Sequence, residues 1–248
     1  MKSLGLIGGT GLDRWGEAVR HHAVESEYGV PSAEVAEFDT GRVRLYFLPR
    51  HGVQHQFPPH AVHYRANVDA LRQLEVDGII AVNAVGGIGA GMGPGRLVVP
   101  DQLIDYTWGR AHSYSMGESD ALRHVEFGEP FSSRLRRGLV LAAVRAGLDV
   151  HDGGCVGVTQ GPRLETAAEV SRLARDGCDL VGMTTMPEAA LAREAGLDYA
   201  SLCVSANWAA GVGDGPVSLQ EIDAVLDVAM KTVRQLLRQF FKVYEDVC

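Results

Sequence analysis

Short apolar runs that end directly in glycine or in small polar residues constrain the fold of this chain more than any other feature of its sequence. Residues 4–7 (Leu-Gly-Leu-Ile) run into a glycine-rich loop at 8–11, and the apolar run at 78–82 leads to glycines at 86–87. Runs of this length that stop at a turn signal are typical of strands. The same pattern predicts further strands at 42–48, 97–99, 156–158, 180–182 and 199–205.

Helical stretches alternate with these strands, and several have recognisable starts. Pro187 fits the first turn of a helix covering 188–195, where a missing N–H group costs little. In a capping box, a hydroxyl and a carboxylate three residues later both satisfy free backbone N–H groups. Two stretches match it, Thr166 with Glu169 and Ser218 with Glu221, and the second opens the longest predicted helix.

The alternation of strands and helices predicts one α/β domain covering residues 1–248, with a central mixed, mostly parallel sheet or a distorted barrel flanked by helices. A hydrophobic content of 46% suits a packed core and excludes a disordered chain. In open α/β sheets, ligands bind beyond the carboxyl ends of the strands. We expect the site there, because small or polar residues follow five strands, at 8–11, 49–52, 83–87, 183–185 and 205–207.

Composition excludes several classes of function. With 31 acidic side chains against 23 basic ones, the net charge of -8 works against binding nucleic acid. No apolar run approaches the roughly 20 residues of a membrane span, and the first residues lack a secretory apolar segment. Four cysteines lie far apart, at 155, 178, 203 and 248, which suits reduced thiols. We therefore expect a cytoplasmic protein without nucleic-acid or membrane partners.

Two loops carry groups that suit a phosphate. In the loop at 8–11, backbone N–H groups can point inward and Thr10 adds a hydroxyl. Arg14 replaces the third glycine of the dinucleotide-binding motif and no Walker lysine follows, so a plain turn is the alternative. The forked guanidinium of Arg50 suits bidentate phosphate contact beside the imidazole of His51. The alternative there is a surface arginine with a packed histidine.

Three other candidates have a simpler explanation beside the functional one. His51 and His55 are spaced like metal ligands, but the stretch lacks a zincin glutamate, so we expect no metal site. Thr184 follows a strand and precedes a helix, where it can meet an anion or simply cap the helix. Asn207 ends the last strand, where an asparagine is often a turn residue.

Together these motifs resemble the purine nucleoside phosphorylase superfamily, specifically its methylthioadenosine phosphorylase branch. The resemblance implies a homotrimer with a site at each subunit interface. It also implies phosphorolysis, in which inorganic phosphate attacks the anomeric carbon of a nucleoside and displaces the purine. Phosphate is then a co-substrate, and no metal or organic cofactor is implied. The matching segments follow family order over nearly the whole chain, at 7–13, 50–52, 64–67, 161–163, 183–188, 192–196 and 199–201.

The resemblance also assigns residues to the parts of the substrate. Met183 is expected against the ribose, and His124 is expected to reach the site of the neighbouring subunit. Either Leu164 or Trp208 is expected to stack on the base. Groups held around one anion position the nucleophile and stabilise charge, which supplies most of the rate. The expected phosphate contacts are Thr10, Arg50, His51, Thr184 and the main chain of Ala84.

The base pocket departs from this branch. Adenine-specific members carry Asp-x-Asp, whereas this chain has Asn207-Trp208-Ala209. An amide can donate to O6 of a 6-oxopurine and accept from a protonated N7. A 6-amino group against the amide donor leaves polar groups unpaired, at about 1–3 kcal/mol or roughly 5–150-fold. We therefore expect a hypoxanthine-like base in contact with Asn207 and Ala209, with Asn207, His51 and Arg50 carrying the catalysis.

The other end of the nucleoside is expected to meet an apolar wall. Phosphorylases of ordinary nucleosides place a histidine on the last helix, but here that helix begins with Leu219 and Ile222. Burying a methylthio group there gains about 0.8 kcal/mol per methylene equivalent; alternatively, both residues are simply core. The combined pockets predict phosphorolysis of S-methyl-5′-thioinosine, with S-methyl-5′-thioadenosine or ordinary 6-oxopurine nucleosides as alternatives. Asn83 replaces a threonine of the branch, and its contact with phosphate or sugar is left open.

Overall fold

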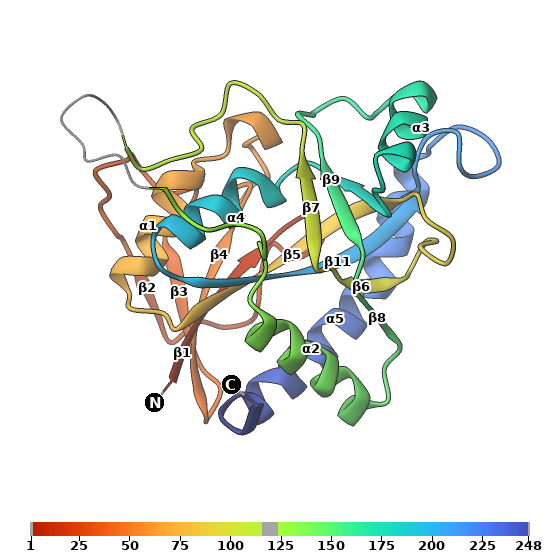
Figure 1. The fold of residues 1–248 in the computed structure, drawn as a ribbon. Coiled ribbons are helices and arrows are strands. Elements are labelled where there is room, and N and C mark those ends of the chain that lie inside the picture. The colour runs from red at the N-terminus through yellow and green to blue at the C-terminus, as the bar shows by residue number, and fades with distance from the viewer. Residues whose placement is uncertain (1, 116–123, 248) are drawn as a thin grey trace.

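The computed structural model describes residues 2–115 and 124–247, in which eleven strands form one sheet with five α-helices around it (Figure 1). The strands are β1 (Lys2–Gly8), β2 (Arg20–His22), β3 (Val35–Asp39), β4 (Val43–Pro49), β5 (Gly78–Gly87), β6 (Leu97–Val99), β7 (Gln102–Asp105), β8 (Val150–Asp152), β9 (Cys155–Val158), β10 (Leu180–Gly182) and β11 (Asp198–Trp208). The helices are α1 (Tyr64–Gln73), α2 (Ser133–Ala146), α3 (Ala167–Arg175), α4 (Thr185–Glu194) and α5 (Leu219–Val247), with a short 3-10 helix at Pro59–Ala61.

The sheet is mixed, as predicted. Its main path runs β2-β3-β4-β1-β5-β10-β9-β7, and β5 also pairs with β11, which continues to β6 and β8. Six of the ten pairings are parallel and four are antiparallel. Among the described residues the pairings do not close into a ring, so the mixed sheet is confirmed and the distorted barrel is not.

The two faces of the sheet are covered by different helices. Alternate side chains of a strand point to opposite faces, so in β5 Ile80 and Val82 join the core beneath α2 and α5, while Ile79 and Ala81 join the core beneath α1 and α4. α3 covers a third, smaller apolar cluster beside β9 and β10. Figure 1 shows α1 and α4 on one side of the sheet and α2 and α5 on the other. Both faces of the central strands are therefore buried.

Most predicted elements are present, and the exceptions have local causes. The capping box of Thr166 and Glu169 starts α3 with both hydrogen bonds formed. The predicted helix at 188–195 is α4, whose first turn is broken at Met186 (φ -111°, ψ 138°), because the residue before a proline is pushed out of the helical region. The short strands β2, β3, β7 and β8 were not predicted, because they lack a long apolar run. No helix in the described ranges is long and apolar enough to cross a membrane.

Candidate active site

A cavity of about 440 Å³ lies where β1, β4, β5, β10 and β11 end. Its size is that of a small-molecule site. β1, β4 and β11 run parallel to β5, so their carboxyl ends lie near one level. β10 runs antiparallel to β5, so the residues after it return along β5 toward Asn83. Predicted site residues that line the cavity are Thr10, Arg50, His51, Ala84, Leu164, Met183, Thr184, Asn207, Ala209 and Ile222.

Arg50 is buried at one end of this cavity in an ion pair with Glu188. Its Nε and Nη2 donate to the two carboxylate oxygens of Glu188, each at 2.8 Å, and Nη1 donates to the carbonyl of Val82 at 3.1 Å. The hydroxyl of Tyr199 donates to the same carboxylate at 2.8 Å. Burial opposes the charged guanidinium, but Glu188 more than offsets this and raises the pKa of Arg50. Because a guanidinium has five N–H groups, two remain for a ligand.

Gly9 of the glycine-rich loop packs directly on this arginine and on β5. A Cβ on Gly9 would lie 2.7 Å from Nη1 of Arg50 and 2.5 Å from the carbonyl oxygen of Val82, so only glycine fits there. Leu12 N–H donates to the carbonyl of Gly9 at 2.9 Å, which closes the turn. Thr10 is then presented to the cavity. The loop is a tight turn packed on Arg50, with its hydroxyl residue facing the site.

His51 is held as a neutral imidazole. Its Nδ1 lies 2.7 Å from the carbonyl oxygen of Phe57; a carbonyl only accepts, so Nδ1 carries the hydrogen. The ring stacks on His55 with 4.5 Å between centroids. Burial, with the charge of Arg50 as the next cause, lowers the pKa of His51 to about 4. At neutral pH its Nε2 therefore offers a lone pair rather than a proton.

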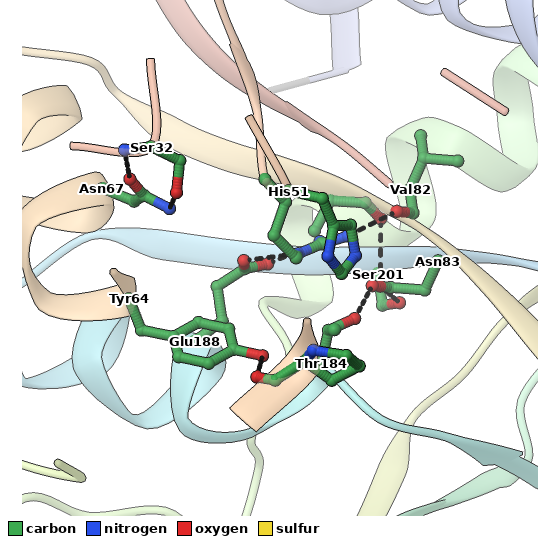
Figure 2. Close-up of polar contacts among 12 residues, drawn as sticks. Ser32, His51, Tyr64, Asn67, Val82, Asn83, Thr184, Glu188 and Ser201 are labelled. Carbon is green, nitrogen blue, oxygen red and sulfur yellow. Dashed lines mark hydrogen bonds and ion pairs between the residues drawn. The ribbon is translucent and has the colours of Figure 1, made fainter. Parts of the chain in front are cut away.

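Thr184 belongs to a buried chain of polar groups. Its hydroxyl donates to Oδ1 of Asn83 at 3.0 Å, and Nδ2 of Asn83 donates to Oγ of Ser201 at 2.7 Å (Figure 2). Thr184 is the N-cap residue of α4, but its side chain makes no hydrogen bond to the first turn, so the helix-cap alternative does not account for its hydroxyl. Asn83 lies behind the cavity wall and contacts Thr184. The side chain of Asn83 is therefore connected to the cavity lining through Thr184.

The opposite end of the cavity carries an amide and a carboxylate. Nδ2 of Asn207 donates to the carbonyl of Trp208 at 2.7 Å, which leaves its second N–H and its Oδ1 for a ligand. Glu165 also lines the cavity and accepts a hydrogen bond from the hydroxyl of Thr159. A carboxylate that accepts and an amide that both donates and accepts can recognise a base with a ring N–H and a carbonyl.

The prediction from sequence missed Glu165. It directly follows Leu164, a predicted wall residue, and the adjoining capping box uses Glu169 instead. The available signal was a carboxylate that directly follows a predicted wall residue and takes no part in the capping box. Of the two candidates for stacking on the base, Leu164 lines the cavity, whereas Trp208 packs against the loops at Gly93 and Gly213.

The apolar wall near α5 is made by Val217, Ile222 and Leu226. Leu219 is not part of this wall, because it stands at the exposed start of α5 with 68% of its surface accessible. His124 is exposed and outside the cavity of its own chain. Among the described residues, no group of three His, Cys, Asp or Glu side chains comes close enough to hold a metal ion.

Comparison with known proteins places this cavity in a family context. The family model described as Phosphorylase superfamily matches residues 3–242. A probable S-methyl-5′-thioinosine phosphorylase of Xanthomonas campestris is 47% identical over 238 residues, 95% of each chain. An S-methyl-5′-thioadenosine phosphorylase of Pyrococcus abyssi is 40% identical over 96% of this chain and 91% of its own length. The structure of methylthioadenosine phosphorylase from Schistosoma mansoni with adenine superposes with a TM-score of 0.93 at 32% identity, covering 99% of this chain and 93% of that one.

Proposed function

Since this chain belongs to the phosphorylase superfamily, we propose that it cleaves S-methyl-5′-thioinosine with inorganic phosphate. A phosphate oxygen bonds to C1′ of the sugar as the C1′–N9 bond breaks. The electron pair leaves with the purine, which takes up a proton at N7 from solvent, while the attacking hydrogen phosphate gives its proton to solvent. The products are hypoxanthine and S-methyl-5-thioribose 1-phosphate. The single observation that carries this assignment is the pair of Glu165 and Asn207 at one end of the cavity.

This pair is complementary to three polar positions of a 6-oxopurine, namely N1, O6 and N7. Glu165 is proposed to accept from N1–H, a donor that adenine lacks. Asn207 can donate to O6 with its free N–H and accept from N7–H with Oδ1. With adenine, the N1 lone pair would face the carboxylate and the 6-amino group would face the amide donor. Unpaired buried polar groups cost about 1–3 kcal/mol each, which supports preference for the oxopurine.

At the other end, the residues proposed for phosphate form a nearly neutral cradle. Thr10, Arg50, His51, Thr184 and Ala84 all line the cavity, and Glu188 balances the charge of Arg50. The lone pair on Nε2 of the neutral His51 can accept a hydrogen bond from a P–OH group of hydrogen phosphate. Groups fixed in this way orient the phosphate toward C1′ of the sugar. Because their dipoles are already aligned, they need not rearrange during the reaction. Met183 lies between the two ends of the cavity, where the ribose is proposed.

The 5′ substituent is proposed to lie against Val217, Ile222 and Leu226, where, within the described part of the chain, no polar side chain lines the wall formed by α5. This supports the methylthio group over a hydroxyl. The relative from Xanthomonas campestris carries the matching name. A probable 6-oxopurine nucleoside phosphorylase of Moorella thermoacetica is 37% identical to this chain. Ordinary 6-oxopurine nucleosides are therefore the second candidate substrates.

A substrate panel tests the proposal directly. Release of base from methylthioinosine, methylthioadenosine, inosine and adenosine is measured with and without phosphate, after dialysis against a chelator. We expect phosphate-dependent release that is fastest for methylthioinosine and survives the chelator, because no metal or organic cofactor is proposed. Faster turnover of methylthioadenosine would contradict the base assignment, and equal turnover of inosine would contradict the apolar 5′ pocket.

We also propose a cytoplasmic homotrimer in which His124 reaches the site of the neighbouring subunit. The exposure of His124 outside its own cavity supports this. Light scattering at working concentration is expected to give three times the mass of one chain. A monomer with full activity would contradict the shared site.

A further inference from the structure

Arg110 stands outside the cavity yet touches both loops that form its walls. We propose that Arg110 is a positioning residue whose guanidinium sets the distance between the base end and the phosphate end of the site. This inference rests on the proposed function, because it concerns the loops that would hold the substrate. One loop follows β9 and carries Leu164 and Glu165; the other follows β10 and carries Met183 and Thr184.

The contacts of Arg110 reach across both loops. On the β10 side, Nη1 donates to the carbonyls of Met183 at 2.7 Å and Met186 at 2.6 Å. On the β9 side, Nη2 donates to the carbonyl of Gln160 at 2.8 Å and to that of Thr159 at 3.3 Å. Nε adds a bond of 3.2 Å to the side-chain oxygen of Gln160. The planar guanidinium of Arg110 therefore connects the loop after β9 with the loop after β10.

Strand pairing alone does not hold these loops together. The parallel pairing of β9 and β10 ends at Val158 and Gly182, and the N–H of Thr159 donates to the carbonyl of Gly182 as the last link at 2.8 Å. Beyond this point the contacts through Arg110 continue the connection, to Gln160 on one side and Met186 on the other.

The chemistry of these contacts indicates a positioning role. Every acceptor of Arg110 is a neutral oxygen, and among the described residues no carboxylate lies within ion-pair distance of it. Burial lowers the pKa of Arg110, and the more distant charge of Asp105 offsets this only in part. The fold therefore keeps a partly desolvated cation without a direct ion pair to any described residue, an arrangement that costs stability. A lysine offers no planar fork and cannot reproduce five donors in fixed directions.

Arg110→Lys, Arg110→Ala and a matched control test the inference. Arg136 is the control, because it also donates to a backbone carbonyl, that of Pro100 at 2.8 Å, but stands away from the cavity. We expect Arg110→Lys to lower kcat by about 100-fold, since a displacement near 1 Å of reacting groups has that effect. We expect Arg136→Lys to keep the wild-type kcat. Millimolar guanidinium ion should restore activity to Arg110→Ala, and methylammonium should not.

Three results would overturn the inference: a kcat of Arg110→Lys no lower than that of Arg136→Lys, no rescue by guanidinium, or equal rescue by methylammonium. Failure of the proposed function is recognised separately, because the wild type would then release no base. In that case the rise in melting temperature caused by inorganic phosphate is compared instead. A smaller rise in Arg110→Lys than in Arg136→Lys supports the inference, and an equal rise overturns it.

Discussion

At the scale of single residues, the choice of base is proposed to depend on the chemistry of Glu165 and Asn207. The two side chains come from different parts of the chain, one from the loop after β9 and the other from the end of β11. Close packing brings these parts together, since a Cβ on Gly211 would lie 2.7 Å from that of Ala167. The carboxylate only accepts hydrogen bonds, whereas the amide does both. Their combination favours a base with a donor at N1.

Replacing Glu165 by glutamine tests the proposal that this carboxylate selects a base with a donor at N1. A hydrogen bond to a charged group contributes about 1.5–3 kcal/mol, so kcat/KM for methylthioinosine is expected to fall by roughly 10–150-fold. The value for methylthioadenosine should stay or rise, because the new amide can donate to N1 of adenine. Glu169→Gln is the matched control, because that carboxylate caps α3 and pairs with exposed Arg163. An equal loss for both substrates would refute the role of Glu165.

At the scale of elements, the start of α3 anchors the loop that carries the base-end residues. Thr166 accepts from the N–H of Glu169 at 3.1 Å, and Glu169 accepts from the N–H of Thr166 at 2.8 Å. Thr166 lies only eight positions after Val158, the last residue of β9. The capping box thus determines where the loop ends and the helix begins.

Thr166→Ala is expected to lower the free energy of unfolding by about 1 kcal/mol, because an N-cap hydroxyl is lost. Thr166→Ser keeps the hydroxyl and should stay close to the wild type. Urea unfolding followed by far-ultraviolet circular dichroism measures both variants. Identical midpoints for the alanine and serine variants would show that the capping hydroxyl does not contribute.

At the scale of the whole molecule, His51 links global stability to pH. Its pKa is about 4 in the folded protein, against about 6.5 in an unfolded chain. As the pH falls from 6.5 to 4, the unfolded state takes up a proton that the folded state does not. This contribution of His51 to stability is therefore complete above pH 6.5 and is lost as the pH falls toward 4.

The expected slope is at most about 1.4 kcal/mol per pH unit within this window. His51→Gln removes the titration, so the difference in unfolding free energy between wild type and variant should be constant above pH 6.5 and change below it. Unfolding curves at several pH values between 4 and 8 provide the measurement. A difference that stays constant over the whole range would contradict a neutral, buried His51.

Local sequence signals were enough to predict the strands that end at the site and the loops that follow them. Apolar runs, turn residues and capping boxes act over a few neighbouring positions, so the sequence alone places Thr10, Arg50, His51 and Thr184 at strand ends. The fold brings all four to one cavity. Their roles toward phosphate stay predictions until a ligand is measured.

Only the tertiary structure decided how these groups are paired. Glu188 is 138 positions from Arg50, and Asn83 is 101 positions from Thr184, yet each pair is in contact. No local sequence pattern predicts contacts between residues so far apart in the chain. These contacts depend on the antiparallel return of β10 along β5 and on the packing of α4 over the sheet. The sequence by itself determined which chemical groups stand at the strand ends. The packing of strands, loops and α4 determined which of them are charged, neutral or free to meet a substrate.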